Sequence, residues 1–241
     1  MPIDERTRAE AQVLARRYPI ARAALLPMLH LVQSVEGHVS EDGIAMCADV
    51  LGITKAEVAS VSTFYTMYKR EPVGDWLLSV CTNPTCQIAG GQAIHDGYVE
   101  ALGGHHDAEA GVTVEHAECL GICGDAPVVQ VNYEMYGRLS HEDGMALLEG
   151  ARKGELPVAL SGVVPPTFGE VERELSGIDD GVDEHLAAAA ARQALSEHPP
   201  VWRSGETFVP GAQHGEGLLL DQSPAAPSPA TQSPAAPGGA E

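Results

Sequence analysis

Positive charge is scarce in this chain. Its 241 residues include 14 lysines and arginines against 34 aspartates and glutamates, which gives a formal net charge of −20. Residues 73–155 contain only three basic residues beside 13 acidic ones. Such a segment repels phosphate backbones, so the sequence argues against nucleic-acid binding and favours a positively charged protein partner.

Long apolar runs are also missing. The longest apolar stretch, AALLPMLHLVQSV, is interrupted by Pro27, His30 and Gln33, and it is shorter than the roughly 20 residues that span a bilayer. The first residues, MPIDERTRAEAQ, show no basic segment followed by an apolar one, so no secretory signal is predicted. We therefore expect a cytoplasmic protein that meets a membrane only through a partner.

The sequence pattern divides the chain into three parts, and residues 1–72 predict a helical domain. Apolar residues recur every three to four positions before Gly37, which suits a helix C-cap. Ser40 is the expected N-cap of the next helix. Thr54 and Glu57 form a capping-box pattern at the start of a further helix.

Residues 73–155 predict a compact α+β domain. The patterns follow the order strand, helix, three strands and helix. The first strand pattern is DWLLSVC, and the first helix pattern starts near Cys86 and stops at the paired glycines 103 and 104. This order is expected to place two pairs of cysteines in loops, one pair after a strand and the other before the next strand.

Residues 156–241 are expected to form an acidic extension that ends in a Pro/Ala-rich tail. Apolar anchors are few after residue 157, and only DEHLAAAAARQALSEH has clear helix propensity. The last stretch repeats QSPAAP and contains no apolar residue larger than Ala or Pro after Leu220. We expect this tail to be disordered, because it cannot offset its own ordering entropy.

Four of the five cysteines fall into two pairs with C-x4-C and C-x3-C spacing, Cys81 with Cys86 and Cys119 with Cys123. Structural disulfides rarely persist in a reducing cytoplasm. Spacing alone therefore leaves two possible ligands for these four cysteines. Four thiolates suit a tetrahedral zinc ion, whereas the wide loops also suit a [2Fe–2S] cluster, in which each iron takes two thiolates.

The fifth cysteine and the histidines are not expected to be ligands. Cys47 lies on an apolar helix face, which predicts a place in the core. His105 and His106 fall in a loop bounded by glycines and are expected in a solvated turn. His116 alternates with strand residues and is expected to face solvent or a partner.

The run ECLGICGDAPVVQVN at residues 118–132, placed downstream of the C-x4-C pair, resembles a known family. This family is the thioredoxin-like [2Fe–2S] ferredoxin subunit of NADH-quinone oxidoreductase, or respiratory complex I, where it is usually called the E subunit. The segment GHVSEDGIAMCADVLGITKAEVASVSTFYTMY is similar to the helical domain of that family, so the resemblance extends from about residue 10 to about residue 155. One departure is Thr85, which stands before Cys86 where much of the family has proline.

The resemblance implies a thioredoxin-like fold for the middle domain, with one [2Fe–2S] cluster and no catalytic residue on this chain. The four cluster ligands would be Cys81, Cys86, Cys119 and Cys123. Gly121 and Gly124 would let the backbone approach the sulfides closely. Pro127 would stiffen the exit from the second loop into the following strand.

The resemblance also implies a role as an electron-transfer subunit that is not catalytic alone. The cluster would exchange single electrons with the FMN of an NADH-oxidising partner subunit, together with other peripheral-arm subunits at the inner face of the cell membrane. FMN and NADH are expected on that partner, because this chain lacks a G-x-G-x-x-G run after a strand. Two alternatives stay open: a homologous diaphorase subunit of an NAD-linked hydrogenase or formate dehydrogenase, and a zinc-stabilised interaction module.

Acidic residues near the second cysteine pair predict a low reduction potential. Glu115, Glu118 and Asp125 lie beside this pair in the sequence. Reduction adds negative charge to a cluster, so neighbouring carboxylates disfavour the reduced state.

Overall fold

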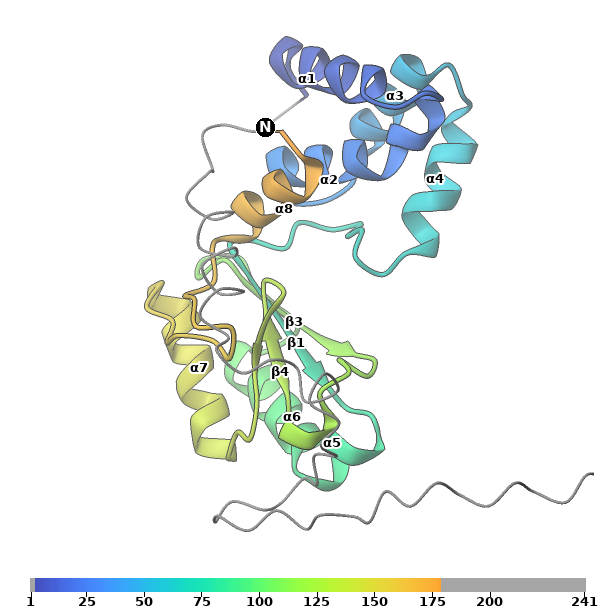
Figure 1. The fold of residues 1–241 in the computed structure, drawn as a ribbon. Coiled ribbons are helices and arrows are strands. Elements are labelled where there is room, and N and C mark those ends of the chain that lie inside the picture. The colour runs from blue at the N-terminus through green and yellow to red at the C-terminus, as the bar shows by residue number, and fades with distance from the viewer. Residues whose placement is uncertain (1–2, 179–241) are drawn as a thin grey trace, which may run out of the picture. The chain divides into compact units, whose positions relative to one another are not determined.

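The structure, a computed structural model, describes residues 3–178 (Figure 1). The first part of the chain forms a helical region. Its elements are α1 (Glu5–Arg16), the 3₁₀ turn η1 (Ala21–Ala24), α2 (Leu25–Glu36), α3 (Glu41–Leu51) and α4 (Lys55–Phe64). No helix within residues 3–178 is both long enough and apolar enough to cross a membrane.

Local capping explains where these helices begin and end. The Ser40 hydroxyl accepts a hydrogen bond of 2.9 Å from the Gly43 amide at the start of α3. Thr54 and Glu57 form the predicted capping box at the start of α4. Gly37 ends α2 in the left-handed conformation, with φ of 71°. These predicted caps are confirmed.

The helical region has its own apolar core. Leu14 of α1, Met28 and Leu29 of α2, and Val58 of α4 are all buried in it. Cys47 of α3 lies in the same core, as the sequence predicts. Burial raises the pKa of the Cys47 thiol to about 12, so this residue behaves as a small apolar side chain.

The second part of the chain contains a five-stranded mixed sheet, in the order β2-β3-β1-β4-β5. The strands are β1 (Trp76–Cys81), β2 (His106–Asp107), β3 (Val112–Ala117), β4 (Val129–Val131) and β5 (Glu134–Tyr136). β1 and β3 are parallel, and the other neighbouring strands are antiparallel. The predicted α+β class is confirmed, whereas the short strand β2 was not predicted.

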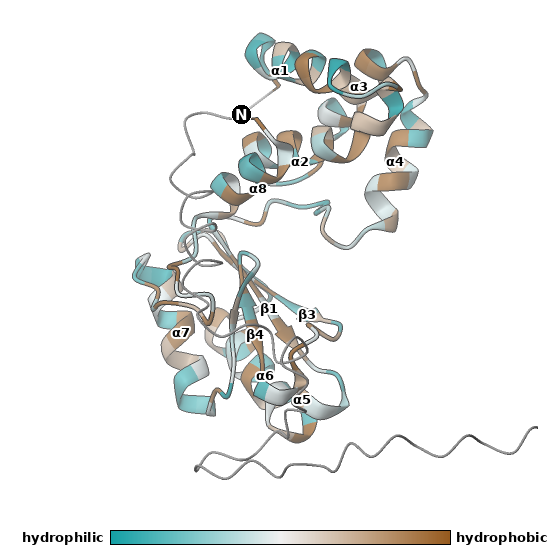
Figure 2. Cartoon of the chain, viewed as in Figure 1, coloured by the Kyte–Doolittle hydropathy of each residue, from teal (hydrophilic) through white to brown (hydrophobic). Residues whose placement is uncertain are grey.

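Helices α6 (Gly91–Leu102) and α7 (His141–Lys153) cover one face of this sheet (Figure 1). Leu78 and Val80 of β1 pack there against Ile94 of α6 and Leu148 of α7. The Tyr98 hydroxyl joins the two helices by donating to the Gly144 carbonyl at 2.9 Å. In Figure 2 the central strands are largely brown, and α1 and α8 mix teal with brown, as amphipathic helices do.

The single helix predicted from near Cys86 to the glycines at 103 and 104 is wrong in one respect. The segment forms two helices, α5 (Pro84–Ile88) and α6, separated at Gly90 with φ of 107°. The next glycine, Gly91, has no room for a side chain. A Cβ at this position would lie 2.5 Å from the Cys81 carbonyl oxygen, so glycine lets α6 start directly against the end of β1.

A further helix, α8 (Phe168–Ser176), was not predicted from the sequence. Thr167 caps it, and the buried Phe168 packs with Val73 and Leu77. The sparse apolar residues after residue 157 predict only an extension, but part of that segment packs closely against α2. The Ala-rich segment with helix propensity and the Pro/Ala-rich tail lie outside the described residues.

A buried carboxylate joins α8 to two other parts of the fold. Glu172 accepts hydrogen bonds from Gln33 of α2 at 2.8 Å and from the Tyr133 hydroxyl at 2.8 Å. His30 Nδ1 lies 2.6 Å from the same carboxylate. Burial, and then the charge of Glu172, raises the pKa of Tyr133. Glu172 therefore ties α8 both to α2 and to the β4–β5 turn.

Candidate functional site

The first cysteine pair lies where β1 ends. Cys81 is the last residue of β1 and is buried, and its amide donates to the Val128 carbonyl at 3.1 Å. Cys86 lies in the short helix α5 and is also buried. The prediction that this pair occupies a loop is therefore wrong in detail: a strand end and a helical turn hold the two thiols.

The second cysteine pair lies after β3 and is exposed. The two sulfur atoms of Cys119 and Cys123 are 3.6 Å apart. Cys123 opens the 3₁₀ turn η2 (Cys123–Asp125). Gly121, between the two cysteines, has φ of 87°, a conformation that glycine adopts without strain. A Cβ at Gly121 or Gly124 would meet nothing within 4 Å, so open space adjoins this loop.

Sheet topology brings the two pairs to the same edge of the sheet. β1 and β3 are parallel neighbours with Cys81 opposite Ala117, so their carboxyl ends meet. Burial raises the pKa of Cys86 to about 11, with further contributions from hydrogen bonding to Cys81 and from the charges of Cys81 and Cys123. The hydrogen bond to Cys119, and then its charge, raises the pKa of Cys123. The pKa values of Cys86 and Cys123 therefore depend on the neighbouring thiols.

These thiols form two pairs rather than one tight group. Within residues 3–178 no set of three or more His, Cys, Asp or Glu side chains is placed to hold a single metal ion. Two pairs of thiolates match a [2Fe–2S] cluster, in which each iron takes two cysteines. Apolar side chains, including Leu120, Ile122 and Val128, adjoin the buried pair and limit its contact with water. The donor set thus fits an iron–sulfur cluster.

The acidic residues near the second pair are partly neutralised. Glu115 forms an ion pair with Lys69, with 2.7 Å between Nζ and Oε2, and accepts a hydrogen bond from Ser79 at 2.7 Å. Asp125 pairs with Arg138 at 2.6 Å. In the sequence these carboxylates count as local negative charge, but in the structure two of the three have a cation beside them. Only tertiary structure brings these cations near.

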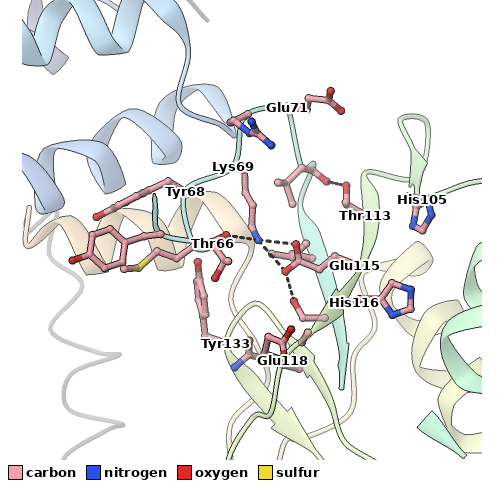
Figure 3. Close-up of a pocket in the computed structure, with 18 of the residues that line it drawn as sticks. Thr66, Tyr68, Lys69, Glu71, His105, Thr113, Glu115, His116, Glu118 and Tyr133 are labelled. Atoms are coloured by element: carbon pink, nitrogen blue, oxygen red, sulfur yellow. Dashed lines mark hydrogen bonds and ion pairs between the residues drawn. The ribbon is translucent and has the colours of Figure 1, made fainter. Parts of the chain in front are cut away.

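A cleft of about 1290 Å³ opens on the sheet face opposite α6 and α7. In Figure 3 the Lys69 ammonium lies between the Thr66 carbonyl, at 3.0 Å, and the Glu115 carboxylate. Tyr133 also lines the cleft, and the lining extends to Cys119. The second cysteine pair is therefore reached from this open face.

The histidines are arranged differently from the sequence prediction. His106 belongs to β2 rather than to a turn, although it is exposed. His116 is exposed, as predicted, but its ring also stacks on His95 of α6. His95 is buried and was not singled out from the sequence. Its position beside Ile94, within the apolar stripe of α6, is the signal that would have indicated burial.

Comparisons with solved structures find low similarity. An NAD⁺-reducing [NiFe]-hydrogenase in the H₂-reduced state is 19% identical, with a TM-score of 0.47, over 54% of this chain. The match covers only 23% of that hydrogenase chain. A thioredoxin-like [2Fe–2S] ferredoxin from Aquifex aeolicus is 22% identical, with a TM-score of 0.32, over 39% of this chain and 97% of that one.

Sequence comparisons are more informative. The E subunit of the NADH-quinone oxidoreductase of Mycobacterium tuberculosis is 40% identical over 178 residues, which cover 73% of this chain and 71% of the relative. A second such relative, from the NADH-quinone oxidoreductase of Rhizobium meliloti, is 34% identical, over 61% of this chain and 90% of the relative. The family model for the thioredoxin-like [2Fe–2S] ferredoxin matches residues 11–152. The chain therefore belongs to the thioredoxin-like [2Fe–2S] ferredoxin family.

Proposed function

We propose that this chain is the electron-transferring E subunit of an NADH-quinone oxidoreductase. In this role it holds one [2Fe–2S] cluster and exchanges single electrons with the FMN of an NADH-oxidising partner subunit. The proposed ligands are Cys81, Cys86, Cys119 and Cys123. The observation that carries the proposal is the meeting of two cysteine pairs at the joined ends of β1 and β3, in a member of this family.

The two cysteine pairs have different parts in this proposal. The cluster, when bound, supplies a centre that takes up or releases one electron at a time. Cys81 and Cys86 anchor its buried side, and the raised pKa of Cys86 means that cluster binding must displace a proton. Cys119 and Cys123 hold the exposed side. The partner would therefore approach from the second loop.

The partner is needed because of the chemistry of NADH. NADH gives up two electrons together as a hydride, whereas the proposed centre accepts one electron. A flavin converts between the two modes. The chain carries no dinucleotide fingerprint, and its relatives are named as subunits of a larger oxidoreductase. FMN and NADH are therefore assigned to the partner, and the contact with the membrane is assigned to the whole complex.

The ligand assignment is tested on the full chain purified without oxygen. We expect two irons and two acid-labile sulfides per chain, with a rhombic S = 1/2 EPR signal after dithionite reduction. Cys119→Ala, which has no donor atom, should lose this signal. Cys47→Ala is the matched control, since Cys47 lies in the helical core, and it should keep the signal. One zinc ion per chain with no signal would instead support the zinc-stabilised module.

The electron-transfer role is tested by adding NADH. The isolated chain should not be reduced by NADH, because it lacks the flavin. The same chain, co-purified with its flavin-bearing partner, should show the reduced EPR signal when NADH is added. Reduction of the isolated chain by NADH would contradict the assignment of FMN and NADH to the partner subunit. Co-purification with a hydrogenase or formate dehydrogenase catalytic subunit would change the parent complex but not the role of the cysteines.

A further inference from the structure

One buried histidine has a nitrogen atom that the fold does not satisfy. His95 of α6 is 3% exposed, and its Nε2 has no hydrogen-bond partner among the residues that the structure describes. Buried polar atoms are nearly always paired, because leaving one unpaired costs its full desolvation energy. An orphaned ring nitrogen of this kind needs an explanation, such as a group that binds to it in another state of the protein.

The surroundings of His95 are rich in titratable groups. Its ring stacks on His116 of β3, with centroids 3.5 Å apart and planes 22° apart, and the His105 ring lies at 5.7 Å. On its own helix, Asp96 Oδ1 lies 3.4 Å from His95 Nδ1. From α7, the side chain of His141 comes close to α6 two residues further on, at Gly97.

The balance of these effects lowers the pKa of His95 and so favours the neutral ring. Burial lowers the pKa of His95, and the charges of His116 and His105 act in the same direction, whereas Asp96 opposes them. With Nδ1 directed at the Asp96 carboxylate, the proton is assigned to Nδ1, and Nε2 carries the free lone pair. A metal ion does not explain this lone pair, because no set of three ligands able to hold one exists within residues 3–178. A proton needs no such set of ligands.

The histidine pair is connected to the proposed cluster ligands. His116 Nδ1 lies 3.2 Å from the Thr82 hydroxyl, and Thr82 directly follows Cys81. The Thr82 amide also donates to the Ala117 carbonyl at 3.4 Å, which holds the two strand ends together. His116 is exposed and lines the cleft of Figure 3, so one ring of the pair meets solvent.

We propose that the His95–His116 pair binds one proton when the cluster accepts one electron. The proton comes from solvent, and the lone pair of His95 Nε2 is the acceptor that the pair offers. The electron comes from the reductant that reduces the cluster, so one negative and one positive charge arrive together. Both leave on reoxidation. This inference rests on the proposed function and makes His95 a charge-compensating residue, not a ligand.

The experiment measures the midpoint potential of the cluster in the full chain from about pH 5.5 to pH 8.5, the range in which histidines titrate. Uptake of one proton per electron lowers the potential by up to about 59 mV per pH unit, which is a tenfold change in proton activity converted for one electron. The wild-type chain should show a clear slope. His95→Phe retains an aromatic ring but lacks the nitrogen atom, and its slope should be close to zero.

Two further variants make the test specific. His116→Gln removes the stacked ring at an exposed position and should also reduce the slope, even if His95→Phe does not fold. His106→Gln is the matched control, an exposed histidine on the neighbouring strand, and should keep the wild-type slope.

The outcomes separate this inference from the proposed function. A normal EPR signal with a flat wild-type slope would overturn proton uptake but leave electron transfer intact. A slope unchanged in His116→Gln and in a folded His95→Phe would overturn the assignment to these residues. Absence of iron and of the EPR signal in the wild-type chain would instead contradict the proposed function, and this inference would fail with it.

Discussion

Glu172 shows at the scale of a single residue how a charge becomes tolerable inside this protein. The side chain is fully buried, yet partners from α2 and from the β4–β5 turn surround its carboxylate. A buried charge with several hydrogen bonds is costly to create but still more costly to disrupt, because its partners are left unsatisfied. Glu172 is therefore a position where a small substitution should have a large effect on stability.

Glu172→Ala should lower the free energy of unfolding by about 3–5 kcal/mol, because it leaves His30 and Tyr133 without their acceptor and removes one of the two acceptors of Gln33 Nε2. Urea unfolding followed by circular dichroism measures this change. Glu174→Ala, two residues along the same helix, is the control and should change stability by no more than about 0.5 kcal/mol. Equal losses in both variants would mean that the effect comes from helix α8 and not from the buried network.

Cys47 gives a second prediction at this scale. Its pKa of about 12 means that only about one thiol in ten thousand is ionised at pH 8, and the residue is fully buried. Iodoacetamide should therefore leave Cys47 unmodified in the native chain at pH 8 and label it in urea, as mass spectrometry of peptides would show. Rapid labelling without denaturant would contradict the core position.

At the scale of elements, the start of α6 depends on Gly91. A Cβ there would lie 2.5 Å from the Cys81 carbonyl oxygen and 2.9 Å from that of Cys86, both of which are backbone atoms. Gly91→Ala should therefore displace the first cysteine pair and reduce the iron content per chain. Gly97→Ala is the control in the same helix, since the atoms nearest to its new methyl group would belong to the side chains of His141 and Met145, not to the backbone. Similar iron contents in the two variants would contradict this role.

The elements also show which features of a fold are visible in a sequence. The caps at Ser40 and Thr54 were predicted because a cap depends on residues three positions apart. Helix α8 was not predicted, because the helix face that packs on α2 includes Glu172. The burial of this carboxylate depends on His30 and other partners that are distant in the sequence. Strand β2 was not predicted either, because it has only two residues and is defined by its pairing with β3.

The candidate site also combines features that are visible in the sequence with features that depend on long-range contacts. Metal-ligand spacing is local, so the two cysteine pairs could be found in the sequence. Their arrangement as separate pairs depends on the parallel pairing of β1 with β3. The cations beside Glu115 and Asp125 and the stacking of His95 on His116 also depend on long-range contacts, which leave no local pattern.

At the scale of the whole molecule, negative charge dominates. The net charge of −20 already includes every cation, and residues 73–155 carry 13 acidic residues against three basic ones, so a negative potential should extend over the ligand region. Lys69 and Arg138 weaken this field next to the second cysteine pair, because each cation lies against a carboxylate. A low reduction potential therefore stays our prediction, with the distributed charge as its main cause and not the three nearest carboxylates.

Salt distinguishes these two sources of charge. The Debye length falls from about 10 Å at 0.1 M salt to about 3 Å at 1 M, so concentrated salt screens distant charges first. The midpoint potential should rise as salt is added, because screening makes the added electron less unfavourable. Arg138→Gln, which leaves Asp125 without its cation, should lower the potential at low salt, and this difference should shrink at high salt. Potentiometric titration monitored by EPR measures both effects. A potential independent of salt in both chains would mean that ligation and hydrogen bonding, rather than the charge of the molecule, set its value.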